Sequence, residues 1–363
     1  MNENQKFYNE LVQRYIDGRA NEKELALFFH LLKEGKLDQY LEENEVQINI
    51  SNKINPKKVL YIKYLKYAAI LFLVGFTTIS IIKYRNTLEI NDQKALLNKI
   101  LPASEKAILL LSDGEEIKLD SNSNGLYLNG GQLKNGYGKL VNDNINEHYL
   151  INVPKGGTFH LVLSDGSKVW LNSDSKLKFP QHFNDGVRQV ELTGEGFFEI
   201  SKRTMENGKQ QSFIVKTKRQ SVEVLGTSFN IRAYGNEENV KSTLFSGIVK
   251  TKDNYSNQIA TLAPGQQAIS DSTGALNVSI ADLEEISGWR SGSFIFNDAP
   301  LKEILSQMST WYDVKIKING NEDFRFNGLF SRNLSLGDAL NVIGHSTDLD
   351  VKYKDNQVIV SAK

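Results

Sequence analysis

The most continuous apolar stretch of the chain lies early, over residues 64–85, YLKYAAILFLVGFTTISIIKYR. Its central part, Tyr67 to Ile82, contains no charged residue. A helix that is apolar on every face is typical of a membrane span, and flanking lysines and tyrosines suit the membrane–water interface. The pattern predicts one transmembrane helix over residues 64–85. The alternative is a buried helix of a soluble domain.

Basic residues near this stretch are unevenly distributed. More of them precede the stretch than follow it: Lys53, Lys57, Lys58, Lys63 and Lys66 against Lys83, Arg85 and Lys94. The positive-inside rule therefore predicts a cytoplasmic N-terminus. The expected localisation is the inner membrane, crossed once, with the C-terminus in the periplasm.

The sequence pattern of residues 1–60 predicts a cytosolic head of short helices followed by a polar linker. Asn21 and Glu24 have the spacing of a capping box at the start of a second helix. That helix carries more apolar side chains than a unit of this size buries alone. Either the helices cover one another or lie on a membrane, or they dock onto a cytosolic partner. The candidate anchors for docking are Leu25, Phe28, Phe29 and Leu32.

Residues 95–275 show the alternation of short β-strands. Two similar segments, LLLSDGEEIKLDSNS at 109–123 and LVLSDGSKVWLNSDS at 161–175, place alternating apolar residues on both sides of Asp-Gly. Asp-Gly between such runs indicates a β-hairpin with a tight turn. The region is predicted to be an all-β domain, and the pattern leaves open whether it is a sandwich or a stacked β coil.

Within residues 290–363 the spacing of apolar residues changes from the alternation of strands to the spacing of helices. Apolar residues at helical spacing, Leu301, Ile304, Leu305 and Met308, precede the strand-like segment YDVKIKI. A second helix with Leu336, Ala339, Leu340 and Ile343 precedes LDVKYK and QVIVSA. Two helix-then-strand units predict a small α+β domain with both helices packed on one sheet. The fold class is thus multidomain, with an all-α head, one transmembrane helix, an all-β domain and a C-terminal α+β domain.

Composition argues against several kinds of chemistry. The chain has no cysteine, and Lys+Arg equals Asp+Glu at 43 each, so neither thiolate chemistry nor a global field for nucleic acid is expected. The histidines lack metal-ligand spacing, and no phosphate-binding glycine motif is present. Glu195 and Glu199 would share a strand face without a nucleophile. We expect a non-enzyme with no metal, no cofactor and no direct contact to nucleic acid.

Several segments resemble the FecR family of inner-membrane signalling regulators. They are VPKGGTFHLVLSDGSKVWLNSDSKLKFP, VELTGEGFFEI, FIVKTKRQSVEVLGTSFNIRAY, LFSGIVK and LAPGQQA, in the family's order. The C-terminal unit, from FIFNDAPLKEILSQMSTWYDVKIKI through FNGLFSRNLSLGDALNVIGH, is similar to the short N-terminal domain of secretins and TonB-dependent transducers. The family resemblance covers nearly the whole chain.

The resemblance implies an anti-sigma factor. In such proteins the cytosolic head holds an extracytoplasmic-function sigma factor, here through Leu25, Phe28, Phe29 and Leu32. An outer-membrane TonB-dependent transporter then signals to the periplasmic domain and the sigma factor is released. Some members also cleave themselves at a Gly-Thr bond, which Gly226 and Thr227 match. The alternative at that position is a glycine bulge within a strand.

A second function from another class is a membrane-anchored periplasmic protein that binds carbohydrate or acts as a scaffold. An exposed Trp170 would stack on sugar rings, whereas a core Trp170 would not.

Overall fold

The computed structural model describes residues 3–44, 75–85, 93–129, 132–142, 148–184, 186–320, 324–345, 349–354 and 357–362. The chain divides into two compact units, Met1–Tyr84 and Arg85–Lys363. The described residues form one hydrophobic core in the first unit and two in the second.

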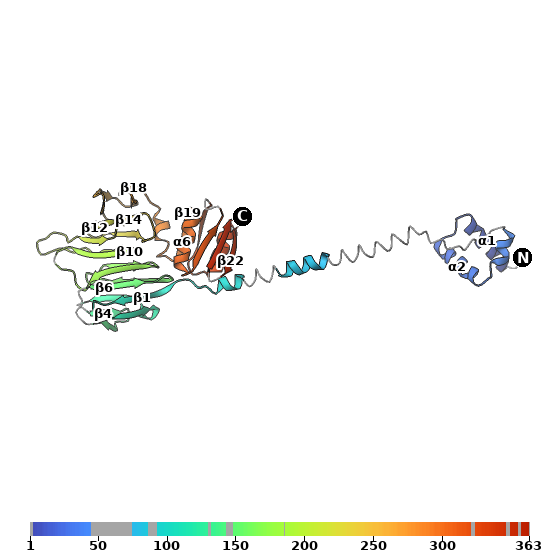
Figure 1. Cartoon of the computed structure of the whole chain (residues 1–363), viewed down its shortest axis with the longest axis horizontal. Helices are drawn as coiled ribbons and strands as arrows, with labels where there is room; N and C mark the ends of the chain where they lie inside the picture. The colour runs from blue at the N-terminus through green and yellow to red at the C-terminus, as the bar shows by residue number, and fades with distance from the viewer. Residues whose placement is uncertain are drawn as a thin grey trace. The chain divides into compact units, whose positions relative to one another are not determined.

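The head, residues 3–44, consists of three helices, which are coloured blue in Figure 1: α1 (Glu3–Ile16), α2 (Glu22–Lys33) and α3 (Asp38–Glu43). The predicted capping box at the start of α2 is confirmed. The Asn21 side-chain oxygen accepts a hydrogen bond from the Glu24 backbone N–H at 3.0 Å, and the Glu24 carboxylate accepts one from the Asn21 N–H at 2.9 Å. The three helices share one core of Leu11, Val12, Phe28, Leu31, Leu37 and Leu41.

The single-span fold class is corrected by the structure. Among the residues that the structure describes, no helix has both the length and the apolar character needed to cross a membrane. Residues 75–85 are helical, but at about 1.5 Å per residue they fall well short of a hydrocarbon core of roughly 30 Å. Residues 64–74 of the predicted span lie outside the described residues.

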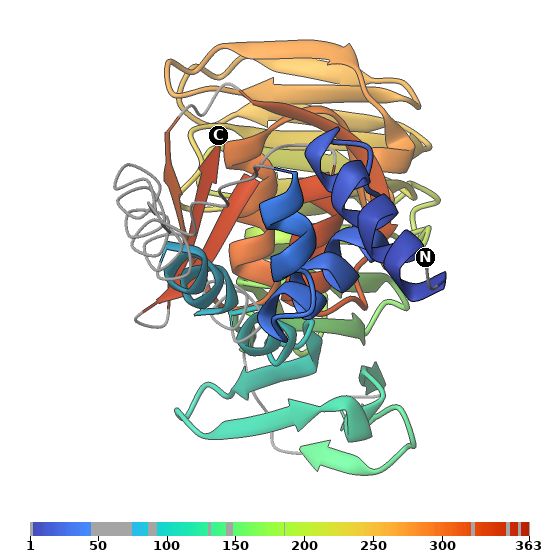
Figure 2. The same ribbon diagram turned by 90° about the vertical axis from the view of Figure 1, so that its right-hand side faces the viewer.

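The β-rich part of the second unit, residues 104–280, forms one continuous sheet of 18 strands with a short 3-10 helix, Ser121–Ser123. The strands are β1 (Ser104–Leu110), β2 (Glu116–Asp120), β3 (Leu126–Asn129), β4 (Gln132–Asn135), β5 (Leu140–Asn142), β6 (His148–Val153), β7 (Gly157–Val162), β8 (Lys168–Leu171), β9 (Ser175–Pro180), β10 (Arg188–Glu199), β11 (Phe213–Lys216), β12 (Gln220–Val224), β13 (Ser228–Ala233), β14 (Val240–Ser246), β15 (Val249–Asp253), β16 (Ile259–Leu262), β17 (Gln266–Ser270) and β18 (Leu276–Ile280). β4 lies at one end of this part and β18 at the other (Figure 1). Figure 2 shows the same separation between the early strands, in teal, and the late strands, in orange.

Strand β10 joins two ladders of strands. Its residues Glu191–Thr193 pair with β9, whereas Gly194–Glu199 pair with β13 on one side and Gly196–Glu199 pair with β8 on the other. Gly194 lies at the change of partner and has φ +95°, a conformation that glycine adopts without strain. Side chains from both ladders enclose a single core, as in a sandwich, so β10 holds the two layers together.

Both predicted Asp-Gly hairpins are confirmed. β1 pairs antiparallel with β2 across Asp113-Gly114, and β7 pairs antiparallel with β8 across Asp165-Gly166. The two glycines have φ +91° and +80°. In each turn the aspartate side chain accepts the backbone N–H two residues on, at 2.9 Å in the first and 3.0 Å in the second. The repeat in the sequence is therefore a repeat of one local turn geometry.

The C-terminal part, residues 283–362, contains three helices and five strands among its described residues. They are α5 (Leu283–Ser287), β19 (Ser293–Pro300), α6 (Leu301–Trp311), β20 (Lys315–Asn319), β21 (Arg325–Ser331), α7 (Leu336–His345), β22 (Leu349–Lys354) and β23 (Gln357–Ala362). The predicted single sheet is wrong, because β19 pairs with β21 while β20, β23 and β22 form a separate sheet. Both α6 and α7 contribute to one core with the two sheets.

Residues 93–100, which precede β1, pack with this C-terminal part. Leu97 is buried in the core of α6 and α7. The Leu336 N–H donates to the Ile100 carbonyl at 3.0 Å, and the Tyr353 N–H donates to the Gln93 side chain at 2.7 Å. The chain thus contacts the C-terminal part before it enters the β-rich part.

Candidate functional site

The four apolar residues predicted as anchors of the head differ in exposure. Phe28 is fully buried, and its ring stacks on that of Tyr15 with centroids 4.0 Å apart. Leu25 and Leu32 are half-buried, and Phe29 is 52 % exposed. Their role in sigma-factor binding stays a prediction. The other exposed apolar side chains among the described residues of the head, Phe7, Ile16 and Leu27, are not among the predicted anchors.

A buried polar network lies where the β-rich part meets the C-terminal part. At its centre is Glu195 of β10, which is 4 % exposed. Its carboxylate accepts hydrogen bonds from the side-chain amides of Asn172 at 2.8 Å and Asn230 at 3.1 Å. It also pairs with Arg232 of β13 at 3.5 Å. With these partners Glu195 serves to connect strands.

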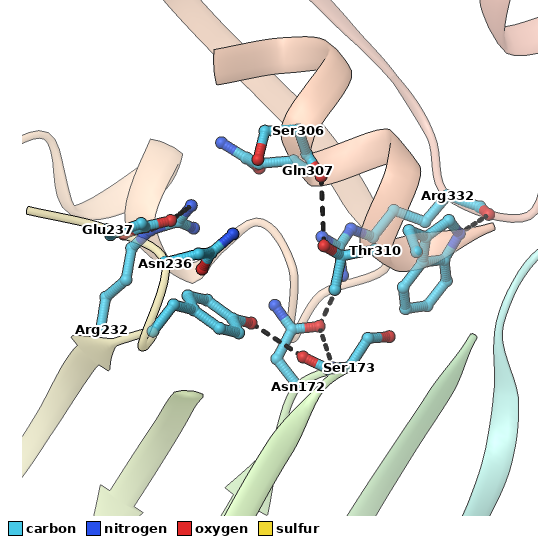
Figure 3. Close-up of a pocket in the computed structure, with 11 residues that line it drawn as sticks. Asn172, Ser173, Arg232, Asn236, Glu237, Ser306, Gln307, Thr310 and Arg332 are labelled. Carbon is cyan, nitrogen blue, oxygen red and sulfur yellow. Dashed lines mark hydrogen bonds and ion pairs between the residues drawn. The ribbon is translucent and has the colours of Figure 1, made fainter. Parts of the chain in front are cut away.

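Arg332, which directly follows β21, brings the C-terminal part into this network. Its side chain is buried between the rings of Phe294 and Trp311, with its guanidinium carbon 4.4 and 4.2 Å from the two ring centroids. Its Nη1 donates to the Asn172 side-chain oxygen at 3.3 Å (Figure 3). Asn172 therefore links Arg332 to Glu195, and through it the C-terminal part to the sheet.

Burial and neighbouring charges shift the pKa values of the ionisable groups in this network. Burial acts to lower the pKa of Arg232, but Glu195 and Glu237 outweigh it and raise that pKa. Burial lowers the pKa of Arg332 to about 10 despite the attraction of Glu195. Arg332 is therefore still a cation at neutral pH. Burial also raises the pKa of Tyr234, whose hydroxyl donates to the Ser173 carbonyl at 2.9 Å.

Further contacts join the two parts beside this network. Arg290 pairs with Glu199 at 2.7 Å and lies over the rings of Phe197 at 4.0 Å and Trp170 at 5.0 Å. Glu195 and Glu199 thus bind different arginines and do not form a carboxylate pair. Trp170 is half-buried, and Arg290 lies over one face of its ring. No observation of the described residues favours carbohydrate binding.

Gly226 and Thr227 lie between β12 and β13. The Thr227 hydroxyl is mostly buried and donates to the Ile248 carbonyl at 3.1 Å. The pairing of β13 with β14 shifts register between Ser228 and Phe229, directly after this dipeptide. The register shift agrees with the alternative of a local bulge. Self-cleavage stays a prediction, and a chain recovered from cells as one intact band would contradict it.

No group of three or more potential ligands among His, Cys, Asp and Glu gathers around a metal position in the part of the chain that the structure describes. The chemistry of the junction is that of charge pairing and hydrogen bonding.

Comparisons with known proteins agree with this order of modules. The family profile described as "FecR protein" matches residues 149–250, within the β-rich part, and that described as "FecR, C-terminal" matches residues 293–360. No curated protein matches the chain.

The solved structures that are similar to the chain include two that share one description. Both are crystal structures of a putative anti-sigma factor from Parabacteroides distasonis ATCC 8503. The one at 2.50 Å resolution is 27 % identical, with a TM-score of 0.54, and the match covers 60 % of this chain and 99 % of that one. The one at 1.65 Å is 28 % identical, with a TM-score of 0.53, covering 59 % and 99 %. A β-rich module followed by a small α+β module defines the class of regulator that the sequence resembles. The chain belongs to the FecR family of anti-sigma factors.

Proposed function

We propose that this chain sequesters an extracytoplasmic-function sigma factor through its helical head. In this proposal the second unit receives a signal from an outer-membrane TonB-dependent transducer, and the sigma factor is then released. The observation that carries the proposal is the paired match to the FecR and FecR C-terminal families, together with similar solved structures described as putative anti-sigma factors. The separate helical unit with exposed apolar side chains supports a docking role for the head.

Phe29 is the best placed anchor within the head. Aromatic side chains that fill a pocket on the partner dominate many interfaces, and an exposed aromatic on a short helix suits a groove. Leu25 and Leu32 flank it and are half-buried. Phe28 cannot contact a partner unless the core of the head opens, because its side chain has no exposure.

Co-purification of the full chain with the extracytoplasmic-function sigma factors of the host tests this proposal. The informative variant is Phe29→Ser, since Phe28→Ser would also disrupt the head's own core. Lys33→Ser, an exposed position on the same helix, is the matched control. We expect a complex with the parent and with Lys33→Ser that Phe29→Ser weakens, and higher transcription of the sigma factor's genes in cells carrying Phe29→Ser. Absence of a complex with every sigma factor of the host would overturn the proposal.

The inner-membrane localisation, with the head in the cytoplasm and the second unit in the periplasm, stays a prediction. Reporter enzymes that are active in only one of the two compartments, fused after residue 44 and after residue 363, test it. Activity of both fusions in the same compartment would contradict it.

The signal from the transducer has its own test. We expect the periplasmic signalling domain of the cognate transducer to bind the full chain, and binding to reduce the amount of sigma factor retained by the head. Unchanged sigma-factor retention at saturating signalling domain would remove the transducer from the proposal while leaving the head's role intact.

A further inference from the structure

A cavity of about 270 Å³ lies between the β-rich part and the C-terminal part of the second unit. Strands β10, β13, β14 and β17 line one side, and α5, β19 and α6 line the other. A water molecule takes up about 30 Å³ in the liquid, so the cavity has room for a small organic molecule. The residues that give it chemical character are Arg232, Lys241, Glu285, Trp289, Glu303 and Arg332.

Arg332 presents hydrogen-bond donors that the protein leaves unused. A guanidinium has five N–H donors, and burial of unpaired polar groups is costly. Among the described residues the guanidinium makes one hydrogen bond, from Nη1 to Asn172, and its buried Nε has no partner. Glu195 also lines the cavity and its charge acts on Arg332, but Asn172 lies between the two side chains. No carboxylate of the described residues forms a direct ion pair with Arg332. Such a group fits an anion that accepts two parallel N–H bonds.

The position of Arg332 is fixed before any ligand binds. The rings of Phe294 and Trp311 hold its guanidinium, and its backbone is held at both ends. The Arg332 N–H donates to the Gly292 carbonyl at 2.9 Å, and the Trp311 ring N–H donates to the Arg332 carbonyl at 3.0 Å. A preorganised donor group loses little conformational entropy on binding.

The α5 and α6 side of the same cavity is acidic. Asp282, Glu285 and Glu303 line it, with Lys241 as a nearby cation. Burial, followed by the charges of Asp282 and Glu303, raises the pKa of Glu285, which indicates that these carboxylates repel one another. A cationic group beside Glu285 and Glu303 would relieve that repulsion. The acidic side disfavours a phosphate, which would bring two negative charges into the cavity.

We propose that this cavity binds a small zwitterion of the α-amino acid class, with its carboxylate on Arg332 and its ammonium group beside Glu285 and Glu303. Trp289, Phe294 and Ile295, which also line the cavity, would contact the apolar portion of the ligand. The site lies in the second unit, so it goes beyond the sigma-factor contact of the head and does not depend on it. It would make the second unit a receiver of a small molecule as well as of a protein signal.

Calorimetric titration and thermal unfolding of the full chain with each proteinogenic α-amino acid at millimolar concentration test the site. Acetate and ethylamine, which carry one of the two charges each, are the controls. We expect at least one amino acid to bind saturably and raise the unfolding temperature, with no comparable effect of acetate or ethylamine. Absence of binding by every amino acid, or acetate binding as tightly as the best amino acid, would overturn the proposal.

Variants on α6 and at Arg332 test the individual contacts to the ligand. Glu303→Gln keeps the shape of a half-buried side chain and removes the charge, and we expect about a tenfold loss of affinity from a charge-assisted hydrogen bond. Lys302→Gln, the adjacent exposed residue outside the cavity, should bind as the parent does. Arg332→Lys keeps the charge without the planar fork and should lose at least as much. Equal affinity in the parent and Glu303→Gln would contradict the assignment of the ammonium group.

Discussion

Arg188 and Asp165 form an ion pair at 2.7 Å in which neither side chain has any solvent exposure. Arg188 begins β10, and Asp165 lies in the turn between β7 and β8. The same guanidinium donates to the carbonyls of Ser201 and Gln211, both at 2.8 Å. One side chain thus ties together a hairpin turn, the strand shared by both ladders and the loop that follows it.

Replacement of Arg188 by Met should destabilise the β-rich part strongly. Removal of one partner of a buried pair leaves an uncompensated buried charge, here on Asp165, and costs about 3–5 kcal/mol. Arg325→Met, which breaks an exposed pair with Asp298, should cost about 0–1 kcal/mol. Urea unfolding of the three chains measures both values. Similar losses in the free energy of unfolding in the two variants would show that the buried ion pair does not stabilise the β-rich part more than an exposed pair does.

The sequence contains the local part of this arrangement but not the long-range part. The Asp-Gly turns and the Asn21–Glu24 capping box depend on residues within a few positions of each other, and the pattern predicted both. The pairing of Arg188 with Asp165 depends on the register of strands that are far apart in the sequence. The two identical Asp-Gly motifs therefore gave no hint that the Asp165 side chain is buried and paired while Asp113 is exposed.

The junction residues were missed for a related reason. Phe326, Phe330 and Arg332 alternate along and just beyond β21, so Arg332 continues the buried face of that strand. This alternation was a usable signal, but a charged residue after a strand is usually exposed. Its partner Asn172 lies 160 positions away, a contact that no local pattern contains. In the head, the helical period predicted an apolar face without separating buried Phe28 from exposed Phe29.

Gly194→Ala should prevent the β-rich part from folding stably. A Cβ at Gly194 would lie 2.4 Å from the Ser175 hydroxyl oxygen and 2.6 Å from the Ser175 Cα, in a backbone conformation that already disfavours side chains. Gly186→Ala is the matched control, because a Cβ there meets open space, and its effect should stay within about 0.5 kcal/mol. The yield of folded protein and its urea midpoint measure the difference. A folded Gly194→Ala chain with the parent's midpoint would contradict the role of this residue.

Asn21→Ala should loosen the start of α2. The Asn21 side chain accepts the backbone N–H groups of Lys23 and Glu24, and loss of such a cap costs about 0.5–2 kcal/mol. We expect faster hydrogen exchange at the amides of Lys23 and Glu24. Asn21→Ser retains an acceptor oxygen and should exchange nearly as slowly as the parent. Equal exchange in Asn21→Ala and Asn21→Ser would show that the cap contributes nothing measurable.

Glu285→Gln should change how stability depends on pH. Burial and neighbouring carboxylates raise the pKa of Glu285 in the folded chain, so the folded state holds this proton more tightly than the unfolded state does. The stability that protonation contributes is present below the ordinary pKa of 4.5 and is lost as the pH rises through the folded value. Between pH 4.5 and neutral pH, the free energy of unfolding of the parent should therefore fall by more than that of Glu285→Gln. Glu284→Gln, an exposed neighbour on the same helix, is the control and should keep the parent's slope. Urea unfolding at several pH values measures the slopes, and identical slopes in the parent and Glu285→Gln would mean that the acidic side of the cavity imposes no electrostatic cost.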